Sequence, residues 1–188
     1  MNVLLGSSSP RRRELLEQLG VEFDIARPDI DETPHAGESP VDYVRRLAVE
    51  KSQVLSVAPD TLVITADTTV DLGGEILGKP DDEDHARAML RQLSARTHRV
   101  HTGVALRLGD AVRSEVVTSL VTFTPLTPAT IDWYVGTGEP LDKAGAYAIQ
   151  GAGGVLVLRV RGSVSNVIGL PLHAVARLAA DLGAPLVG

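Results

Sequence analysis

Residues 3–13 read Val3-Leu4-Leu5-Gly6-Ser7-Ser8-Ser9-Pro10-Arg11-Arg12-Arg13. The apolar run predicts a strand that ends in a hydroxyl-rich turn. The turn predicts the start of a helix, because Ser9 suits the N-cap and Pro10 the first helical position. Arginines in a first turn oppose the helix dipole, and together with free amides and hydroxyls they form a phosphate site. A solvated basic turn is the alternative interpretation of the same residues.

Composition narrows the class of protein. The chain has 188 residues, of which 44% are hydrophobic and 22% charged, which is typical of one soluble globular domain over residues 1–188. The formal net charge is −6 and aromatic residues are only 3%, which argues against a nucleic-acid partner. A local basic cluster in an acidic chain therefore favours a small anionic ligand.

The sequence also lacks the marks of several other classes. It contains no cysteine, which excludes disulfides, zinc thiolate sites and thiol catalysis. No apolar run is long enough to span a bilayer, and no signal-peptide pattern opens the chain. We therefore expect a cytoplasmic protein without a membrane partner.

Strand and helix patterns alternate along the chain. We expect strands at 2–6, 21–27, 61–66, 98–108, 111–124 and 155–160, and helices at 10–19, 40–57, 81–93, 128–135 and 171–182. Turn signals at Gly73-Gly74 and Gly109-Asp110 predict hairpins. Residues 136–154 form a Gly-rich loop region. This interleaving predicts an α/β fold, and the hairpins indicate a mixed sheet.

Four charged side chains stand out as candidates for chemistry. Asp67 follows a buried apolar run, and a carboxylate at the carboxyl end of a strand is a common catalytic placement in α/β sheets. An aspartate that only starts a turn is the alternative. Lys51 on a helix and Lys79 in a rigid Gly-Lys-Pro turn are weak candidates when taken singly. Glu32 and Asp67 together suit a divalent cation, because Mg²⁺ takes one or two carboxylates plus phosphate oxygens.

Other polar and aromatic residues divide into candidates and structural groups. Gln150 carries an amide donor and acceptor that suit the imide edge of a base, although a surface glutamine in a turn is the alternative. Asn166 is interpreted as a turn former, with a polar contact in the site as the alternative. His98 and His101 are three apart on a strand and face opposite sides, so they are not expected to share a metal. Trp133 is expected in the core.

Taken together, these segments resemble the Maf nucleoside-triphosphate pyrophosphatases. They occur in family order over nearly the whole chain: Gly6-Ser7-Ser8-Ser9-Pro10-Arg11-Arg12, Arg46-Leu47-Ala48 with Lys51, Ala66-Asp67-Thr68, Leu77-Gly78-Lys79-Pro80, Met89-Leu90 to Gly103, Gly138-Glu139-Pro140 through Gln150-Gly151, and Gly169-Leu170-Pro171. The resemblance implies an elongated mixed sheet flanked by helices, with two lobes around a central cleft.

The resemblance also implies an activity. The family hydrolyses a nucleoside triphosphate between the α and β phosphates, to a monophosphate and pyrophosphate, with a divalent metal that is usually Mg²⁺. Asp67 matches the catalytic acid-base residue, and Glu32 and Asp67 match the metal site. The positions that line the phosphate and metal site are Ser7, Arg11, Arg12, Glu32, Lys51 and Lys79. Base preference is set at Arg11, Thr68 and Gln150, and this trio resembles the branch that acts on dTTP, UTP and modified uridine nucleotides as a house-cleaning enzyme, often as a homodimer.

Some residues depart from the family pattern. Ala148 stands where glycine is usual, Gly6 replaces the usual alanine, and Val164-Ser165 replace bulkier aromatic residues. Ala148 is expected to narrow the base pocket. Two alternatives stay open: a pyrophosphatase of the sister branch that acts on 7-methyl-GTP, and a non-catalytic nucleotide-binding regulator of cell division.

Overall fold

The structure is a computed structural model that describes residues 1–187. One seven-stranded sheet runs through it in the order β2-β1-β3-β5-β6-β7, with β4 paired to β3. Its strands are β1 (Asn2–Gly6), β2 (Asp24–Ala26), β3 (Thr61–Leu72), β4 (Glu75–Leu77), β5 (Thr97–Leu108), β6 (Ala111–Phe123) and β7 (Val157–Arg161). Strand β1 is parallel to β2 and β3, and all other pairs are antiparallel. The mixed α/β class is confirmed.

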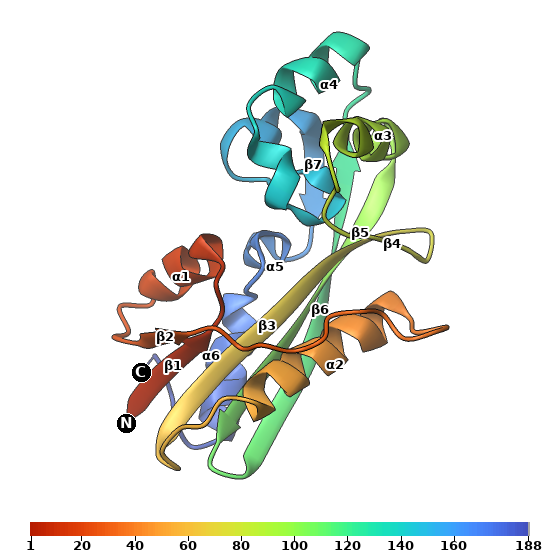
Figure 1. Cartoon of the computed structure of the whole chain (residues 1–188). Coiled ribbons are helices and arrows are strands. Elements are labelled where there is room, and N and C mark those ends of the chain that lie inside the picture. The colour runs from red at the N-terminus through yellow and green to blue at the C-terminus, as the bar shows by residue number, and fades with distance from the viewer. Residues whose placement is uncertain (188) are drawn as a thin grey trace.

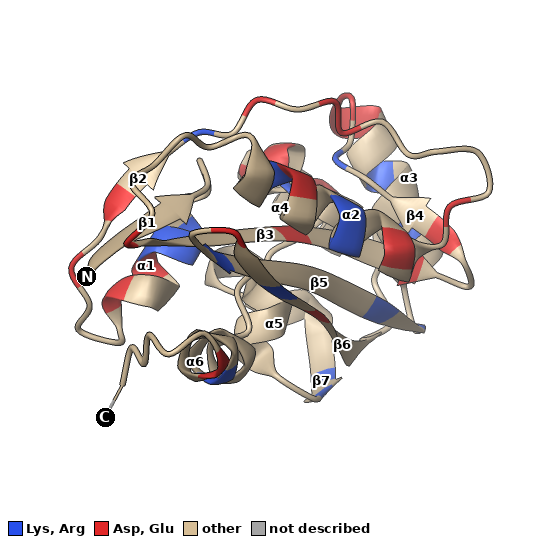
Figure 2. Ribbon diagram, turned by 90° about the horizontal axis from the view of Figure 1, so that it is seen from below, with Lys and Arg blue, Asp and Glu red and all other residues tan. Residues whose placement is uncertain are grey.

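Helices cover both faces of this sheet. They are α1 (Pro10–Glu17), α2 (Pro40–Gln53), α3 (Glu83–Leu93), α4 (Pro128–Val135), α5 (Val164–Ile168) and α6 (Leu172–Asp181). The Gly-rich region contains three short 3-10 helices, η1 (Glu139–Asp142), η2 (Ala144–Ala146) and η3 (Gly151–Leu156). Figure 2 shows α2 on one face of β3 and β5, and α5 and α6 on the opposite face. Helix α5 was not expected, because its single turn is too short for a periodic pattern.

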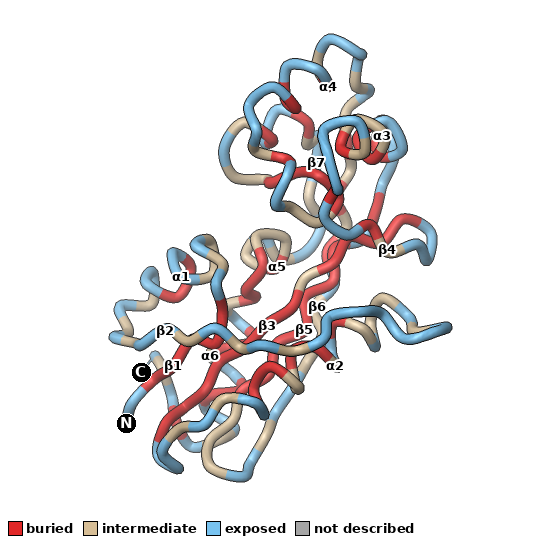
Figure 3. The backbone as a smooth tube through the Cα atoms, viewed as in Figure 1, coloured by how far each residue is buried: buried red, intermediate tan, exposed pale blue. Residues whose placement is uncertain are grey.

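The long strands carry two hydrophobic cores. One core joins β1, α1 and α6 to the first half of β3, and the other joins α3 and α4 to the far end of β3 and to β6. Strands β3, β5 and β6 run through both lobes, and buried residues follow them along the length of the molecule (Figures 1 and 3). The expected two-lobed, elongated fold is confirmed, whereas a single domain over 1–188 stays a prediction.

Two local expectations, the end of β3 and the burial of Trp133, were wrong, and the N-cap expectation at Ser9 was confirmed only in its position. Strand β3 does not end at Ala66 but continues to Leu72, because it pairs with β5 far beyond the end of its parallel neighbour β1. Ser9 occupies the N-cap of α1, but its side chain makes no capping bond, and its backbone N–H donates to Ser7 Oγ (3.1 Å). Trp133 is 51% exposed, because α4 buries Ile131 and Tyr134 instead.

Helix α2 lies directly on β5 because residue 103 has no side chain. A Cβ at Gly103 would overlap the carbonyl group of Val44 and lie 2.9 Å from the backbone nitrogen of Arg45. The hydroxyl of Thr65 on β3 also donates to the carbonyl of Ala48 on α2 (2.6 Å). This close contact between helix and sheet sets the height of the α2 side chains above β3.

We expect Gly103→Ala to lower the free energy of unfolding by about 1–3 kcal/mol, because backbone atoms of α2 must move away from the sheet. Chemical denaturation measures this change. Gly78→Ala is the matched control, since a Cβ at Gly78 meets no atom within 4 Å, and it should shift stability by less than about 0.5 kcal/mol. Equal stabilities of the two variants would contradict the prediction.

Candidate active site

A cleft of about 570 Å³ lies between the two lobes, within the usual size range of ligand pockets. Its walls come from the β1–α1 turn, α2, the middle of β3 and the segment 142–150. All the site residues predicted from the sequence line it: Ser7, Arg11, Arg12, Glu32, Lys51, Asp67, Thr68, Lys79 and Gln150. The structure thus brings together side chains that are far apart in the sequence, and their individual roles stay predictions.

The register of the parallel strands explains why the cleft opens beside Asp67. Gly6, the last residue of β1, pairs with Thr65, whereas β3 continues. Asp67 therefore lies just beyond the carboxyl end of its neighbour, next to the turn that begins at Ser7. A Cβ at Gly6 would lie 2.7 Å from side-chain atoms of Leu55 and Thr65, which explains the glycine at this position. The crevice arises where β1 ends and not where β3 ends.

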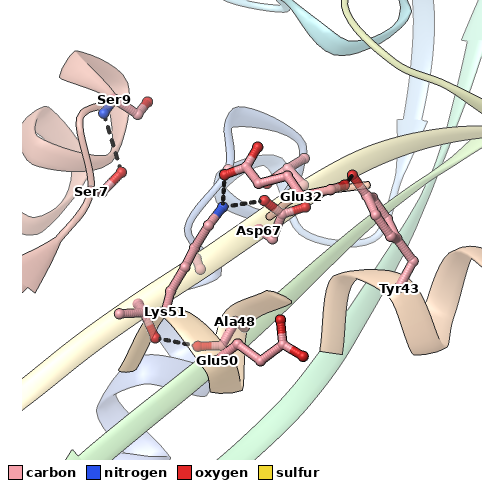
Figure 4. Close-up of polar contacts among 12 residues, drawn as sticks. Ser7, Ser9, Glu32, Tyr43, Ala48, Glu50, Lys51 and Asp67 are labelled. Carbon is pink, nitrogen blue, oxygen red and sulfur yellow. Dashed lines mark hydrogen bonds and ion pairs between the residues drawn. The ribbon is translucent and has the colours of Figure 1, made fainter. Parts of the chain in front are cut away.

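Two carboxylates converge on one ammonium group at the floor of the cleft. Lys51 Nζ lies 2.7 Å from Asp67 Oδ1 and 2.7 Å from Glu32 Oε1 (Figure 4). The Lys51 and Asp67 side chains are buried, whereas that of Glu32 is about half exposed. Tyr43 holds the Glu32 segment in place, because its hydroxyl donates to the Glu32 carbonyl (2.9 Å).

The two carboxylates differ in proton affinity. Burial raises the pKa of Asp67, and the charges of Lys51 and Arg12 only partly oppose this effect. For Glu32, partial burial acts in the same direction, but the hydrogen bond and charge of Lys51 outweigh it and lower the pKa. Asp67 is therefore the better proton acceptor of the pair.

The guanidinium of Arg12 is held mainly by the protein. It donates to the carbonyls of Gly169 and Ala66 (both 2.8 Å), to Thr68 Oγ1 (3.1 Å) and to Ser7 Oγ (3.3 Å). These bonds use four of its five N–H groups. Arg12 therefore joins α1, β3 and the loop before α6, and it offers positive charge to the cleft more than free hydrogen-bond donors.

In contrast to Arg12, Arg11 and Gln150 each carry a polar atom that forms no hydrogen bond within the described protein. Arg11 Nε and Gln150 Oε1 are buried and have no hydrogen-bond partner among the described residues. Burial also lowers the pKa of Arg11, which reflects the cost of holding this cation away from water. Because unsatisfied buried polar groups are rare in native proteins, two of them on one cleft indicate a polar ligand.

The Thr68 hydroxyl belongs to a chain of hydrogen bonds. Thr102 Oγ1 donates to the Asn166 carbonyl (2.9 Å), so the Thr68 hydroxyl donates to Thr102 (2.9 Å) and accepts from Arg12. The Asn166 amide is fully buried and donates to the Val100 carbonyl and to Ser119 Oγ. Asn166 is thus a structural link between α5 and the sheet and not the turn former expected from the sequence.

The residues that hold the Gly-rich loop beside Gln150 were not predicted from the sequence. The Glu139 carboxylate accepts from the backbone N–H groups of Ala152 (3.0 Å) and Gly153 (3.1 Å) and from the Tyr134 hydroxyl (2.8 Å). The Tyr134 hydroxyl in turn accepts from the N–H of Ala148 (3.1 Å), the alanine that lines the cleft. The only sequence signal was the Gly138-Glu139-Pro140 block, which says nothing of a partner thirteen residues later.

The donor set suits a divalent cation that substrate oxygens help to bind. No group of three or more carboxylate or imidazole side chains that could hold a metal occurs among residues 1–187. Glu32 and Asp67, however, both reach the Lys51 ammonium, so their oxygens converge on one place. Two carboxylates completed by phosphate oxygens form a set that Mg²⁺ accepts. These two residues therefore fit a metal that binds together with the substrate.

The chain matches a known protein family over nearly its whole length. The sequence profile described as "Maf-like protein" matches residues 2–182. The chain belongs to the Maf family. A dTTP/UTP pyrophosphatase of Myxococcus xanthus is 56% identical over 98% of this chain and 94% of its own length. Proteins of the same name from Anaeromyxobacter dehalogenans and Symbiobacterium thermophilum are 55% and 46% identical, each over 98% of this chain and 95% of their own length.

The Maf fold of this chain also resembles a more distant solved structure. A HAM1 protein from Coxiella burnetii superposes with a TM-score of 0.52 at 15% identity, over 97% of this chain and 98% of the other. At this identity the likeness concerns the fold alone. In the described part of the Maf chain, no helix combines the length and the apolar character that a membrane crossing requires.

Proposed function

We propose that this Maf protein hydrolyses nucleoside triphosphates, with dTTP, UTP and modified uridine nucleotides preferred, to the monophosphate and pyrophosphate. The names of relatives that are 46–56% identical support the reaction and the substrate class. The observation that carries the proposal is the buried Asp67–Lys51 pair at the floor of a cleft whose wall also holds unpartnered Arg11 and Gln150 atoms. Removal of non-canonical nucleotides from the nucleotide pool is the role that follows.

In the proposed reaction, the oxygen of a water molecule attacks the α-phosphorus in line with the bond to the β-phosphate. That P–O bond breaks, and pyrophosphate leaves with the bonding electrons. Asp67 orients the water and accepts its proton, a role that the raised pKa of this carboxyl favours. Arg11, Arg12, Lys51 and Lys79 offset the negative charge of the triphosphate. A divalent cation on Glu32 and Asp67 would add charge neutralisation at the phosphate oxygens.

Base selection is assigned to the other end of the cleft. The imide edge of uracil or thymine carries one N–H donor between two carbonyl acceptors. The Gln150 amide can hydrogen-bond this edge, because its NH₂ group donates and its Oε1 accepts. Its buried Oε1 lacks a partner in the described chain. Thr68 Oγ1 donates its proton to Thr102 and so offers a ligand only a lone pair.

We expect Gln150→Ala to reduce the preference for UTP over GTP by at least about tenfold, because one lost hydrogen bond to a buried base edge is worth about 1.4 kcal/mol. The ratio of kcat/KM values for the two substrates measures this effect. Gln92→Ala, at an exposed position on α3, is the matched control and should leave the ratio unchanged. An unchanged ratio in Gln150→Ala would refute the role in base choice.

One screen tests the function as a whole. Pyrophosphate release is measured with dTTP, UTP, modified uridine triphosphates, GTP and 7-methyl-GTP, each with and without Mg²⁺. The proposal expects Mg²⁺-dependent release that is fastest with the uridine and thymidine substrates. Preferred release from 7-methyl-GTP would place the chain in the sister branch, and binding without release would make it a non-catalytic nucleotide-binding regulator.

The remaining family expectations belong to the same proposal. A homodimer is what the family resemblance implies, and light scattering on the purified protein tests its mass. The cytoplasmic location expected from the sequence stays a prediction. The single-domain expectation is tested by calorimetry, which should show one cooperative transition for both lobes.

A further inference from the structure

A second, small pocket of about 60 Å³ adjoins the cleft. It shares Ser7, Ser8, Arg12, Glu32 and Lys51 with the cleft, and its remaining wall includes Arg27. Space of this size holds roughly four water-sized groups, which matches the oxygens of one phosphate. Arg27 has no role in the site described so far.

The sheet places Arg27 at the mouth of this pocket. Ala26, the last residue of β2, pairs with Gly6, the last residue of β1. Arg27 therefore follows β2 at the same edge at which Ser7 follows β1. The carboxyl ends of adjacent parallel strands form the crevice in which α/β proteins bind ligands. Pro28 restricts Arg27 to extended backbone, which carries the chain along this edge.

The Arg27 guanidinium has no protein partner. Within residues 1–187 it makes no side-chain hydrogen bond and no ion pair, whereas Arg12, Arg13 and Arg46 are all engaged with acceptors. Its side chain is exposed, and it lines the pocket. An arginine that lines a polar pocket without a carboxylate partner leaves its bidentate donors to an anion.

The charges around the pocket favour a phosphate. Arg12, Arg27 and Lys51 line it together with a single carboxylate, Glu32, which is already paired with Lys51. Gln150 and Thr68, the residues proposed to select the base, line the cleft but not the pocket. A triphosphate whose base lies against Gln150 therefore directs its far end toward Arg27.

We infer that Arg27 and this pocket bind the terminal phosphate of the substrate, and after hydrolysis hold the leaving pyrophosphate. The inference rests on the proposed function for the orientation of the triphosphate. The pocket itself is defined by charge and geometry, so its binding of free pyrophosphate can be measured without turnover.

The test compares Arg27→Ala with Arg13→Ala, which removes an exposed arginine paired with Glu17. Titration calorimetry with inorganic pyrophosphate and with UMP, both in the presence of Mg²⁺, measures binding directly. We expect Arg27→Ala to raise the Kd for pyrophosphate at least about tenfold, as loss of charge-assisted hydrogen bonds does, and to leave the Kd for UMP unchanged. Arg13→Ala should match the unmodified protein for both ligands.

Kinetics separate this inference from the proposed function. The KM for UTP should rise in Arg27→Ala, and Arg27→Lys should recover part of the loss. If the unmodified protein releases no pyrophosphate from any triphosphate, the proposed function fails, but a selective loss of pyrophosphate binding in Arg27→Ala still supports the pocket. Pyrophosphate affinity equal to that of the unmodified protein, or an equal loss of UMP affinity, overturns the inference.

Discussion

Asp67→Asn is expected to slow pyrophosphate release from UTP by about 10²–10⁴-fold, because the amide cannot accept the proton of the attacking water. The substitution keeps the shape of the side chain, and the amide oxygen can still accept from Lys51 Nζ, now 2.7 Å from Asp67 Oδ1. Because burial raises the pKa of Asp67, the charge of this carboxylate is costly in the folded state, and its removal should not unfold the protein.

The matched control for this variant is Asp71→Asn. Asp71 lies on the same face of β3, is also buried, and contacts His101 and the backbone of Gly74, but it does not line the cleft. Turnover of UTP by Asp71→Asn should stay within a few-fold of the unmodified protein, whatever its stability. Near-normal pyrophosphate release by Asp67→Asn, with an intact thermal transition, would sink the assignment of Asp67.

Local signals in the sequence predicted the secondary structure well. The helix expected from residue 40 begins at Pro40, and the Ser39 side chain caps it by accepting from the backbone N–H of Asp42, only three positions away. The Gly109-Asp110 turn joins β5 and β6 as expected, with Gly109 at φ +57°. Such features follow from neighbouring residues, so one sequence is enough to predict them.

The contacts that build the site are of another kind. Arg12 was predicted as a phosphate contact, yet its Nε–H donates to the carbonyl of Gly169, which is 157 positions away in the sequence. The length of β3 was underestimated because its extension past Ala66 depends on pairing with β5, which the sequence of β3 alone does not reveal. The role of Glu139 was missed for the same reason, because its backbone partners Ala152 and Gly153 lie thirteen and fourteen positions later, beyond a loop whose sequence has no periodic pattern. The motifs therefore indicated which residues line the cleft, but not which hydrogen bonds each side chain forms within the protein.

Lys51→Met is the second substitution with a large expected effect. It leaves the buried Asp67 carboxylate without its closest cation, and removal of one partner of a buried pair lowers the free energy of unfolding by about 3–5 kcal/mol. Glu32 contributes less to this loss, because water reaches its half-exposed side chain. Turnover of UTP should also fall by at least about 10²-fold, since the triphosphate loses one preorganised cation. Chemical denaturation and pyrophosphate release measure the two effects.

The double variant Lys51→Met/Asp67→Asn separates charge from packing. If an uncompensated carboxylate causes the instability, the neutral amide should restore much of the lost unfolding free energy, whereas independent effects would only add.

The stability of Lys51→Met should also depend on pH in the direction that an uncompensated carboxylate requires. Loss of Lys51 raises the folded-state pKa of Asp67 further above its unfolded value of 3.8, so Lys51→Met should regain stability as the pH falls through that folded-state pKa. The double variant should lack this acid stabilisation, and a pH response shared by both variants would show that Asp67 is not its source.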